Sequence, residues 1–406
     1  MPALDFVTPF SAADVTPIAD LIGDASIVAI GENNHHIHEF GLLRDKLLRH
    51  LVEHRGFTVL GFESGFPEGH LVDAWLQGAP GEVADIGRDG FTFSLGDSPE
   101  VHGMLTWLRE HGGVRFAGLD VPSSGGSPVP SLDAVRAYLA EVDADAVSLV
   151  DAATAAVQPY IGVSNAVAME RYKTTSTTER DAATAALSVL VAHFDALAPA
   201  YRQRGGAEAF ATARHHAIGA LRIDLHLREV TAMMSGTAPA MGSSSRDTYM
   251  AATVRLLRER ADAKIVLMLH NGHLQRTPFT ALPGIAFPPA GMQLAEEFGD
   301  DYFALGITAT TGTTTGLAPQ EGTRLGFRSY EQKLDAPAEG SVEEALAGAA
   351  PCLVDLRADR ASRAAGNQGP ASIRHAHMAT PADVVHAFDA LVCLPRMSVS
   401  GNVPKE

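Results

Sequence analysis

The sequence predicts an α/β fold with a mostly parallel central sheet flanked by helices and interrupted by a helical insertion. The first observation is that short, almost wholly apolar segments alternate with amphipathic ones, as in parallel strands buried between helices. The second is that this alternation stops between residues 131 and 240, where the chain is rich in alanine and has no convincing strand. We therefore divide the chain into the first part of an α/β catalytic body (1–130), the insertion (131–240) and the second part of the body (241–406).

The segment 1–130 is predicted to contain three buried strands, each followed by a helix. Its clearest helix is 39–54, where leucines recur at helical spacing. A second helix is expected to begin at Pro99, because Ser98 is a good N-cap and proline suits the first helical position. The full expectation is a helix at 12–24 with Ser11 as its N-cap, strands at 26–30, 57–62 and 114–119, helices at 39–54, 68–76 and 99–111, and irregular loops at 77–96 and 123–130.

The remaining chain is predicted to be helical at first and then to return to strand–helix alternation. Gly205 and Gly206 should interrupt two long helices, and a linker of small residues should follow at 236–245. The Thr- and Gly-rich stretch 308–316 is expected to follow a strand without belonging to it. Ser341 and Glu344 fit a capping box. We expect helices at 246–261 and 341–349, strands at 264–269, 302–307, 352–356 and 390–394, and a loose tail after Pro395.

The composition of the chain indicates which classes of binding partner are unfavourable. The formal charge of −17 argues against nucleic acid or an anionic membrane surface, because both would repel an acidic protein. The two cysteines, Cys352 and Cys393, lie in apolar runs and are expected to be buried, reduced thiols. No signal-peptide pattern opens the sequence, and no apolar run reaches the roughly 18 residues of a membrane span. We expect a cytoplasmic protein that acts on a small molecule.

Four of the predicted strands end in titratable residues. They are Glu32 with His35, Glu63, Asp120, and His270 with His273. Since the carboxyl ends of parallel strands face one crevice, these side chains are expected to converge, although Asp120 could equally cap the helix that follows it. Histidine suits general base work near neutral pH, and a carboxylate beside it fixes its tautomer. Arg44, on the following helix, could pair with the acids or hold a substrate oxygen.

Other chemistries compete with this interpretation. A zinc site built from His35, His270 and His273 with an acid is conceivable, but the second histidine of a zincin motif is missing. Covalent catalysis is disfavoured, because no nucleophile elbow occurs and neither cysteine adjoins a histidine motif. We expect no metal and no cofactor. His215, His216 and His226 in the insertion are expected to be ordinary packed or solvated histidines, and Trp75 and Trp107 are expected to be core residues.

The same motifs resemble the erythromycin esterase family. Its Gly-Glu-x-x-His turn matches residues 31–35, its Glu-Phe and Leu-Arg pairs match 39–40 and 43–44, and its strand-end acid matches Glu63. Its His-Asn-Gly-His matches 270–273, its Arg-Asp-x-x-Met-Ala helix start matches 246–251, and a C-terminal Phe-Asp-Ala-Leu-Val matches 388–392. The chain departs from the family pattern at Asn33-Asn34, at 36–38 and at Thr253, so the surroundings of the site are expected to differ.

The resemblance implies a metal-independent esterase or lactonase that opens a macrolactone or a related natural-product ester, with a helical portion over a deep cleft. By motif, His35 would be the general base, and Glu32, Glu63, Arg44, His270 and His273 the other catalytic residues. Substrate-binding residues are predicted to be His36, His38, Asp120 and Asn271. Two alternatives stay open: a non-hydrolytic tailoring enzyme (cyclase, dehydratase or acyl transferase) that uses the same histidine, and a binding protein without activity.

Overall fold

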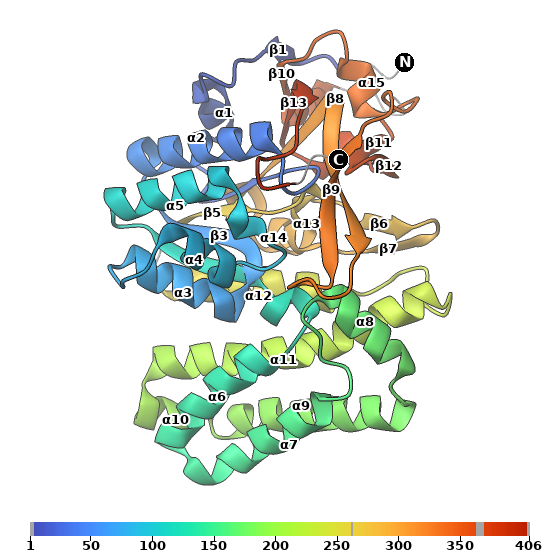
Figure 1. The fold of residues 1–406 in the computed structure, drawn as a ribbon. Coiled ribbons are helices and arrows are strands. Elements are labelled where there is room, and N and C mark those ends of the chain that lie inside the picture. Colours follow the sequence, from blue (N-terminus) through green and yellow to red (C-terminus); the bar gives the residue numbers. More distant parts are fainter. Residues whose placement is uncertain (1–3, 261–262, 363–368, 404–406) are drawn as a thin grey trace.

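The computed structural model describes residues 4–260, 263–362 and 369–403 and places a central β-sheet between layers of helices (Figure 1). The strand order is β1-β10-β13-β8-β2-β5-β3-β4, with β9 paired to β8 outside this path. The strands from β13 to β4 in this order are mutually parallel, whereas β1, β10 and β9 pair antiparallel. The prediction of a mostly parallel α/β sheet is confirmed.

The strands and helices have the following bounds. The sheet strands are β1 (Val7–Pro9), β2 (Ile27–Ile30), β3 (Phe57–Gly65), β4 (Arg115–Asp120), β5 (Lys264–Met268), β8 (Tyr302–Pro319), β9 (Phe327–Lys333), β10 (Cys352–Asp355) and β13 (Ala390–Met397); two small hairpins are β6 (Phe279–Leu282) with β7 (Ile285–Phe287) and β11 (Ser372–His375) with β12 (Met378–Pro381). The helices are α1 (Thr16–Ile22), α2 (His38–Arg55), α3 (Phe66–Leu76), α4 (Val83–Gly90), α5 (Pro99–His111), α6 (Val129–Val142), α7 (Val147–Val157), α8 (Asn165–Thr174), α9 (Thr177–Ala196), α10 (Ala198–Gly205), α11 (Ala207–Met234), α12 (Ser245–Arg260), α13 (Asn271–Leu274), α14 (Ala290–Phe298), α15 (Val342–Leu346), α16 (Leu356–Ser362) and α17 (Val384–Ala387).

The central strands are buried on both faces, which explains their almost unbroken apolar sequence. In β2, Val28 and Ile30 pack into a core with α2 and α5, whereas Ile27 and Ala29 pack into a second core with α12 and α14. Successive side chains of a strand point to opposite faces, so a strand covered on both sides needs apolar residues at every position. Ser98 caps α5 as predicted, since its Oγ accepts a hydrogen bond from Val101 N.

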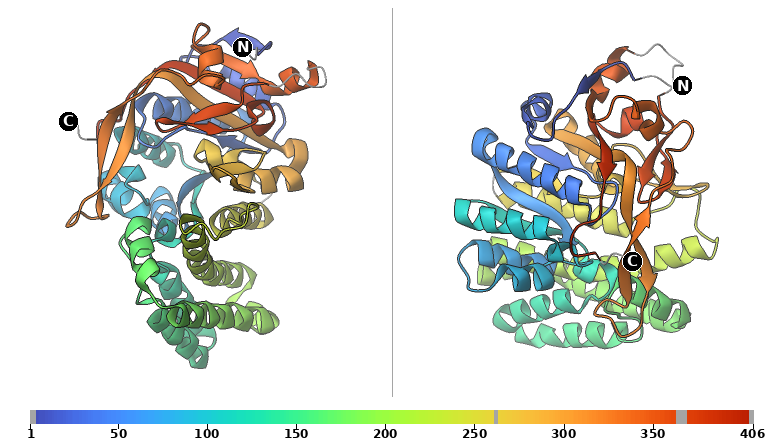
Figure 2. Two further views of the ribbon diagram at one scale, coloured as in Figure 1. Left: turned by 90° about the vertical axis from the view of Figure 1, so that its right-hand side faces the viewer. Right: turned by 45° about the horizontal axis from the view of Figure 1, so that its top comes forward.

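Helices α6 to α11, which we call the helical layer, lie below the body in Figures 1 and 2. They share a third apolar core, to which the body contributes Phe66, Val121 and Tyr249. Gly205 ends α10 and Gly206 precedes α11, as the sequence predicted. Within the described residues, no single helix is long and apolar enough to cross a membrane, and only α9 joined with α10 across a 72° bend meets that test. The division at residues 131 and 240 stays a prediction.

Several local predictions are wrong. The expected loop 77–96 contains α4 and a short 3₁₀ helix, and α1 begins at Thr16 rather than beside Ser11. The Thr-rich stretch 308–316 continues β8 and forms a hairpin with β9, because threonine favours strands as strongly as it marks turns. The cap of α15 is half a capping box: Ser341 Oγ accepts from Glu344 N, but Glu344 accepts from Gly340 N. Of the helix expected at 246–261, the last residue lies outside the described residues.

The segment after Pro395 is also ordered by contacts, where a loose tail was expected. Strand β13 continues to Met397, and Ile37 pairs with Val399 in an antiparallel bridge. Glu39 accepts hydrogen bonds from Ser398 N and Oγ, both at 2.7 Å. The C-terminal segment therefore packs against the turn that follows β2.

Candidate active site

The four titratable strand ends come from adjacent parallel strands, β2, β5, β3 and β4, and their carboxyl ends meet at one edge of the sheet. Glu32 and His35 follow β2, His270 and His273 follow β5, Glu63 ends β3, and Asp120 ends β4. Close packing of the first two turns depends on Gly31, where an added Cβ would lie 2.0 Å from Asn271 Oδ1. The structure thus brings the predicted residues together, with Arg44 from α2.

His35 is held by one carboxylate and faces another. Its Nδ1 lies 3.0 Å from Glu32 Oε1, and its Nε2 lies 3.9 Å from Glu63 Oε1, which is beyond hydrogen-bonding distance. Nδ1 therefore carries the proton that Glu32 accepts, and Nε2 is left with a free lone pair. Burial alone would lower the pKa of His35, but the hydrogen bond that it donates to Glu32 and the charge of Glu63 raise it above 6.5.

Glu32 is kept ionised by Arg44. The Nη1 atom of Arg44 lies 2.6 Å from Glu32 Oε1, and both side chains are only 6% exposed. Burial would raise the pKa of Glu32, but the charge of Arg44 and the hydrogen bond to His35 lower it to about 2. Arg44 is itself buried and pairs with Glu32 through Nη1, whereas its Nε and Nη2 have no hydrogen-bond partner within the described residues.

Glu63 lies at the centre of the site. A register shift between Phe62 and Gly65 distorts the pairing of β3 with β4 at this point, and such bulges re-aim side chains. Its Oε1 lies 2.9 Å from Arg246 Nη2 and 3.3 Å from His273 Nε2, and its Oε2 accepts from His270 N at 2.7 Å. Burial opposes ionisation, but the charges of His273 and Arg246 hold the pKa of Glu63 well below 4.5.

His273 lies between two acids. Its Nδ1 lies 2.7 Å from Asp247 Oδ1, on the side opposite Glu63. Burial would lower its pKa, but Asp247 and Glu63 raise it to about 10, so the imidazolium persists through neutral pH. Asp247 is fixed in turn by the backbone N–H of Ala290 and by Ser244 Oγ. This carboxylate was quoted in a family motif but not assigned to the site.

Arg246 is a second cation that the sequence analysis left unassigned. Its Nε and Nη2 make a bidentate pair with Asp120, at 2.7–3.0 Å, and its plane lies over the ring of Phe93. Asp120 is fully buried and its carboxylate is occupied by Arg246, so its predicted contact with substrate stays a prediction. No hydrogen bond in the described chain engages Nη1 of Arg246, which lines a cavity.

His270 and Asn271 are occupied by the backbone. His270 Nε2 donates to Asn33 O at 2.9 Å and its Nδ1 accepts from Gly272 N, while burial lowers its pKa to about 4. Asn271 Nδ2 donates to Ile307 O at 2.8 Å, and this side chain is fully buried. Both residues therefore shape the turn after β5, and neither offers a free polar atom to a ligand.

His36 and His38 point away from the acids. His36 has a left-handed backbone with φ of 58°, and its ring contacts Phe93 O and Asn402 Nδ2, both at 3.3 Å. His38 begins α2, with Nδ1 2.5 Å from Glu100 Oε1 and a half-exposed side chain. Both side chains connect this part of the chain to residues of other segments. That they contact substrate stays a prediction.

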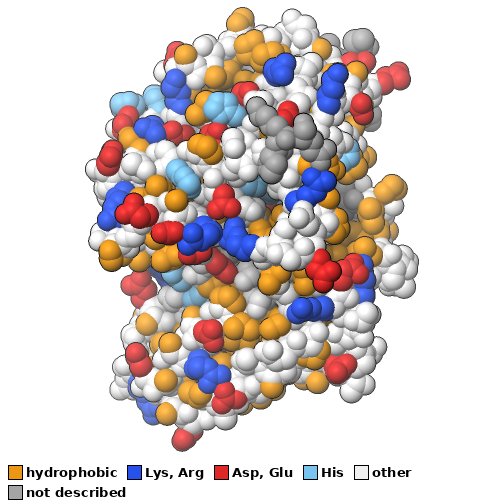
Figure 3. Space-filling view, viewed as in Figure 1, with side chains coloured by type: hydrophobic (Ala, Val, Ile, Leu, Met, Phe, Trp, Pro, Cys, Tyr) orange, Lys and Arg blue, Asp and Glu red, His pale blue; other side chains and the backbone are white. Residues whose placement is uncertain are grey.

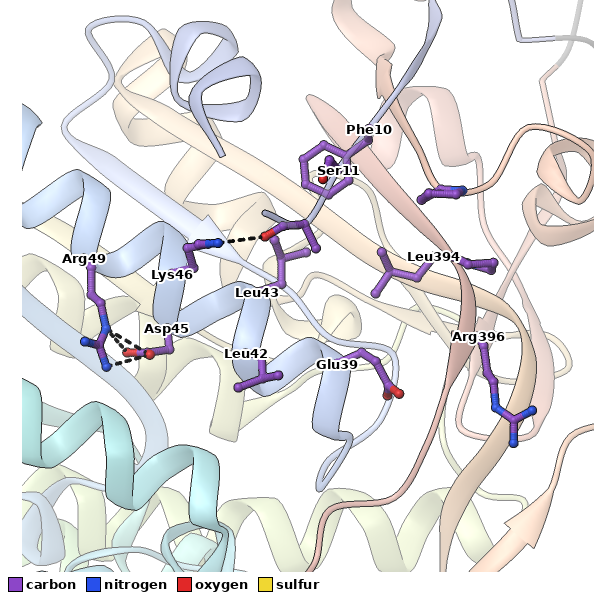
Figure 4. A pocket seen from close by; sticks show the side chains of 13 residues that line it. Phe10, Ser11, Glu39, Leu42, Leu43, Asp45, Lys46, Arg49, Leu394 and Arg396 are labelled. Atoms are coloured by element: carbon purple, nitrogen blue, oxygen red, sulfur yellow. Dashed lines mark hydrogen bonds and ion pairs between the residues drawn. The ribbon is translucent and has the colours of Figure 1, made fainter. Parts of the chain in front are cut away.

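A cavity of about 250 Å³ adjoins these groups. Arg246, Asp247, His270 and His273 line it on the body side, and α11 lines it on the other. Hydrophobic side chains lie in the recess right of centre in Figure 3, on the side where β6 and β7 lie in Figure 1. A larger cavity, about 790 Å³, lies elsewhere, between α2, the segment before α1 and the end of β13 (Figure 4), and none of the acid–base residues line it.

The same residues were also considered as a zinc site. The described residues contain no group of three or more His, Cys, Asp or Glu side chains arranged to hold a metal ion. Their nitrogens and oxygens are paired with one another instead: His35 with Glu32, and His273 with Asp247 and Glu63.

The chain is similar to known proteins in both sequence and fold. The family model described as erythromycin esterase matches residues 52–397. Erythromycin esterase type II of Escherichia coli is 34% identical over 82% of this chain and 81% of its own length, and type I of the same organism is 28% identical over 93% and 92%. A mutant of the erythromycin esterase EreC in its open conformation superposes with a TM-score of 0.83, at 26% identity over 96% of both chains. The chain belongs to the erythromycin esterase family, whose members hydrolyse ester bonds, and it is itself such a hydrolase.

Proposed function

We propose that this protein hydrolyses the ester bond of a macrolactone with water that His35 activates. The observation that carries the proposal is the His35 ring: its Nδ1 donates to the buried carboxylate of Glu32, while its Nε2 is unbound, 3.9 Å from the Glu63 carboxylate that Arg246 and His273 share. The relatives named as erythromycin esterases support a macrolide or a related polyketide-like lactone as the substrate.

In the proposed reaction, His35 Nε2 takes a proton from water as the water oxygen attacks the ester carbonyl. Glu32 stabilises the resulting imidazolium through Nδ1. Arg246 and the imidazolium of His273 face the developing oxyanion, where fixed positive charge is most effective. The intermediate collapses by breaking the carbon–oxygen bond, and the leaving alkoxide takes a proton from His35 or His273. The products are a carboxylic acid and an alcohol.

Incubation of the purified protein with 14- and 16-membered macrolactones tests this proposal. Because hydrolysis adds one water, the product mass should exceed that of the substrate by about 18 Da. The result should be unchanged by a chelator, since no metal takes part in the proposed steps. A product of unchanged mass would support cyclisation or rearrangement, a product that has lost water would support dehydration, and tight binding without turnover would support a binding protein; each would overturn the proposal.

The dependence of kcat/KM on pH should be bell-shaped. His35 must be neutral to accept a proton, so activity should rise with pH through a midpoint above 6.5, where its raised pKa lies. His273 must be charged, so activity should fall as pH passes about 10. Initial rates between pH 5 and about 11, corrected for spontaneous lactone opening, measure both limbs.

Asp247→Asn provides the control for the alkaline limb. It removes the largest charge that raises the pKa of His273, so this limb should move to lower pH while the acidic limb stays in place. An acidic limb below pH 6.5, or an alkaline limb that the substitution does not move, would contradict these assignments.

A further inference from the structure

His226 lies in the wall of the cavity beside the acid–base residues, although the sequence offered no reason to separate it from its neighbours. The cavity is lined from α11 by His226, Glu229, Val230 and Met233, a spacing that puts all four on one face of the helix. Arg246, Asp247 and His273 line the body side of the same cavity. The helical layer therefore contributes this histidine to the space in which the ester would be placed.

The imidazole of His226 is unpaired, unlike those of its neighbours on α11. His215 Nε2 bonds Thr253 Oγ1 at 2.9 Å, and His216 bonds both Ser131 and His70. By contrast, Nε2 of His226 is buried without a hydrogen-bond partner, and no bond joins its Nδ1 to any residue of the described chain. Burying an unpaired polar group costs free energy, and such a group is often satisfied by a ligand.

The surroundings define what His226 can bind. Burial and the charge of Arg246 lower its pKa to about 3, so the ring is neutral and offers one N–H donor and one nitrogen acceptor. A hydroxyl group can pair with either ring nitrogen, because it can donate to the acceptor nitrogen or accept from the N–H. An ammonium group is disfavoured by the nearby cations Arg246 and His273, and a carboxylate would pair with those cations instead.

A mostly apolar extension of the cavity indicates which kind of molecule would bear this hydroxyl group. A second cavity of about 200 Å³ shares Glu229, Met233, Ser243 and Phe287 with the first and continues along α11 beneath β7. Its walls include Ala232, Pro239 and Ile285. The combined space suits an apolar scaffold with few hydroxyl groups.

We propose that His226 is a substrate-binding residue that hydrogen-bonds a hydroxyl group of the ester substrate and so selects a hydroxylated lactone. This inference rests on the proposed function and deepens it. His226 takes no proton in the reaction; it orients the ring of the lactone toward His35.

The test compares His226→Leu with the unsubstituted protein on two substrates: a hydroxylated macrolactone and the same lactone with the hydroxyl removed. Loss of one neutral hydrogen bond should lower kcat/KM for the hydroxylated lactone about five- to tenfold, mainly through KM. The deoxy lactone should be hydrolysed equally well by both proteins. The Tm of the variant should stay level or rise, because an unpaired buried nitrogen is removed.

His216→Leu is the matched control, since His216 lies on the same helix but bonds protein partners. It should lower Tm and leave KM unchanged. If His226→Leu behaved in this way, or lost the same factor on both lactones, the inference would be overturned while the proposed function stood. If the unsubstituted protein opened neither lactone, the proposed function and this inference would fall together.

Discussion

Replacing His35 by asparagine is expected to lower kcat for ester hydrolysis by about 10²- to 10⁴-fold, the range that general base catalysis contributes. Asparagine can still donate to Glu32 from its amide, so the turn after β2 keeps its main contact. It cannot accept a proton from water, because a neutral amide is a very weak base. Single-turnover rates with a macrolactone measure the loss, and circular dichroism with Tm shows whether the fold persists.

His38→Asn is the matched control for this substitution. His38 lies three residues further along the same turn, also close to a carboxylate, but its partner is Glu100 and its side chain is half exposed. The rate of His38→Asn should stay within about twofold, since this half-exposed side chain pairs with Glu100 and with none of the acid–base residues of the site. A His35→Asn protein that retained full activity, or a His38→Asn protein that lost as much, would show that the base has been misassigned.

The convergence of the site was predictable because it depends on one topological rule. Parallel strands that run through a sheet present their carboxyl ends to one edge, so Glu32, Glu63, Asp120 and His273 could be assigned to one crevice without knowing the strand order. The apolar runs identified the strands because both faces of the sheet are covered.

Which side chains of the site pair with one another could not be predicted from the sequence, because pairing depends on side-chain directions that the spacing of residues does not determine. Asp120 was predicted to contact substrate, and in the structure its carboxylate pairs with Arg246. The sequence pattern could not show which arginine of the chain would be that partner. Asn271 lies between two histidines of the motif and was predicted to bind substrate, but its side-chain amide donates to the backbone of Ile307 in β8. The only available signal for Arg246 and Asp247 was their place at the start of a helix after a linker of small residues.

His226 illustrates a second limit. It lies on a helix with several buried neighbours, and histidine at such a position is ordinarily satisfied by packing or by protein partners. What distinguishes it is the lack of a partner, which becomes visible only when the surroundings of each ring nitrogen are known. The extension of β8 through 308–316 was missed for a related reason. This stretch is stabilised as a strand by pairing with β9, which follows a turn, and the strand propensity of the stretch itself does not include that pairing.

Replacing Glu63 by glutamine should damage both stability and activity. The carboxylate is almost fully buried and is shared by Arg246 and His273, so its loss leaves two partly buried cations with fewer counter-charges. Breaking such an interaction costs about 3–5 kcal/mol, and the remaining partners, Asp120 and Asp247, place the expected loss near about 3 kcal/mol. Because both cations would shift, kcat/KM should fall by at least about 10²-fold. Urea unfolding and lactone turnover at pH 7.5 measure the two effects.

Glu68→Gln is the control, because Glu68 is a partly buried glutamate whose pKa is shifted in the opposite direction. Its Oε1 accepts from Ser123, its Oε2 has no partner, and burial raises its pKa above 4.5. The pKa of Glu63 is depressed, so the stability it contributes is present above about pH 4.5 and is lost as pH falls. The pKa of Glu68 is raised, so its contribution is present at low pH and is lost as pH rises through the folded pKa.

The two substitutions should therefore change the free energy of unfolding with opposite dependence on pH. The deficit of Glu63→Gln should stay constant down to about pH 4.5 and shrink below it, whereas Glu68→Gln should approach or exceed the stability of the unsubstituted protein as pH rises through the raised pKa of Glu68. Equal slopes for the two variants would mean that Glu63 is not held ionised by its cations. In that case the charge that keeps His273 protonated would have to come from Asp247 alone.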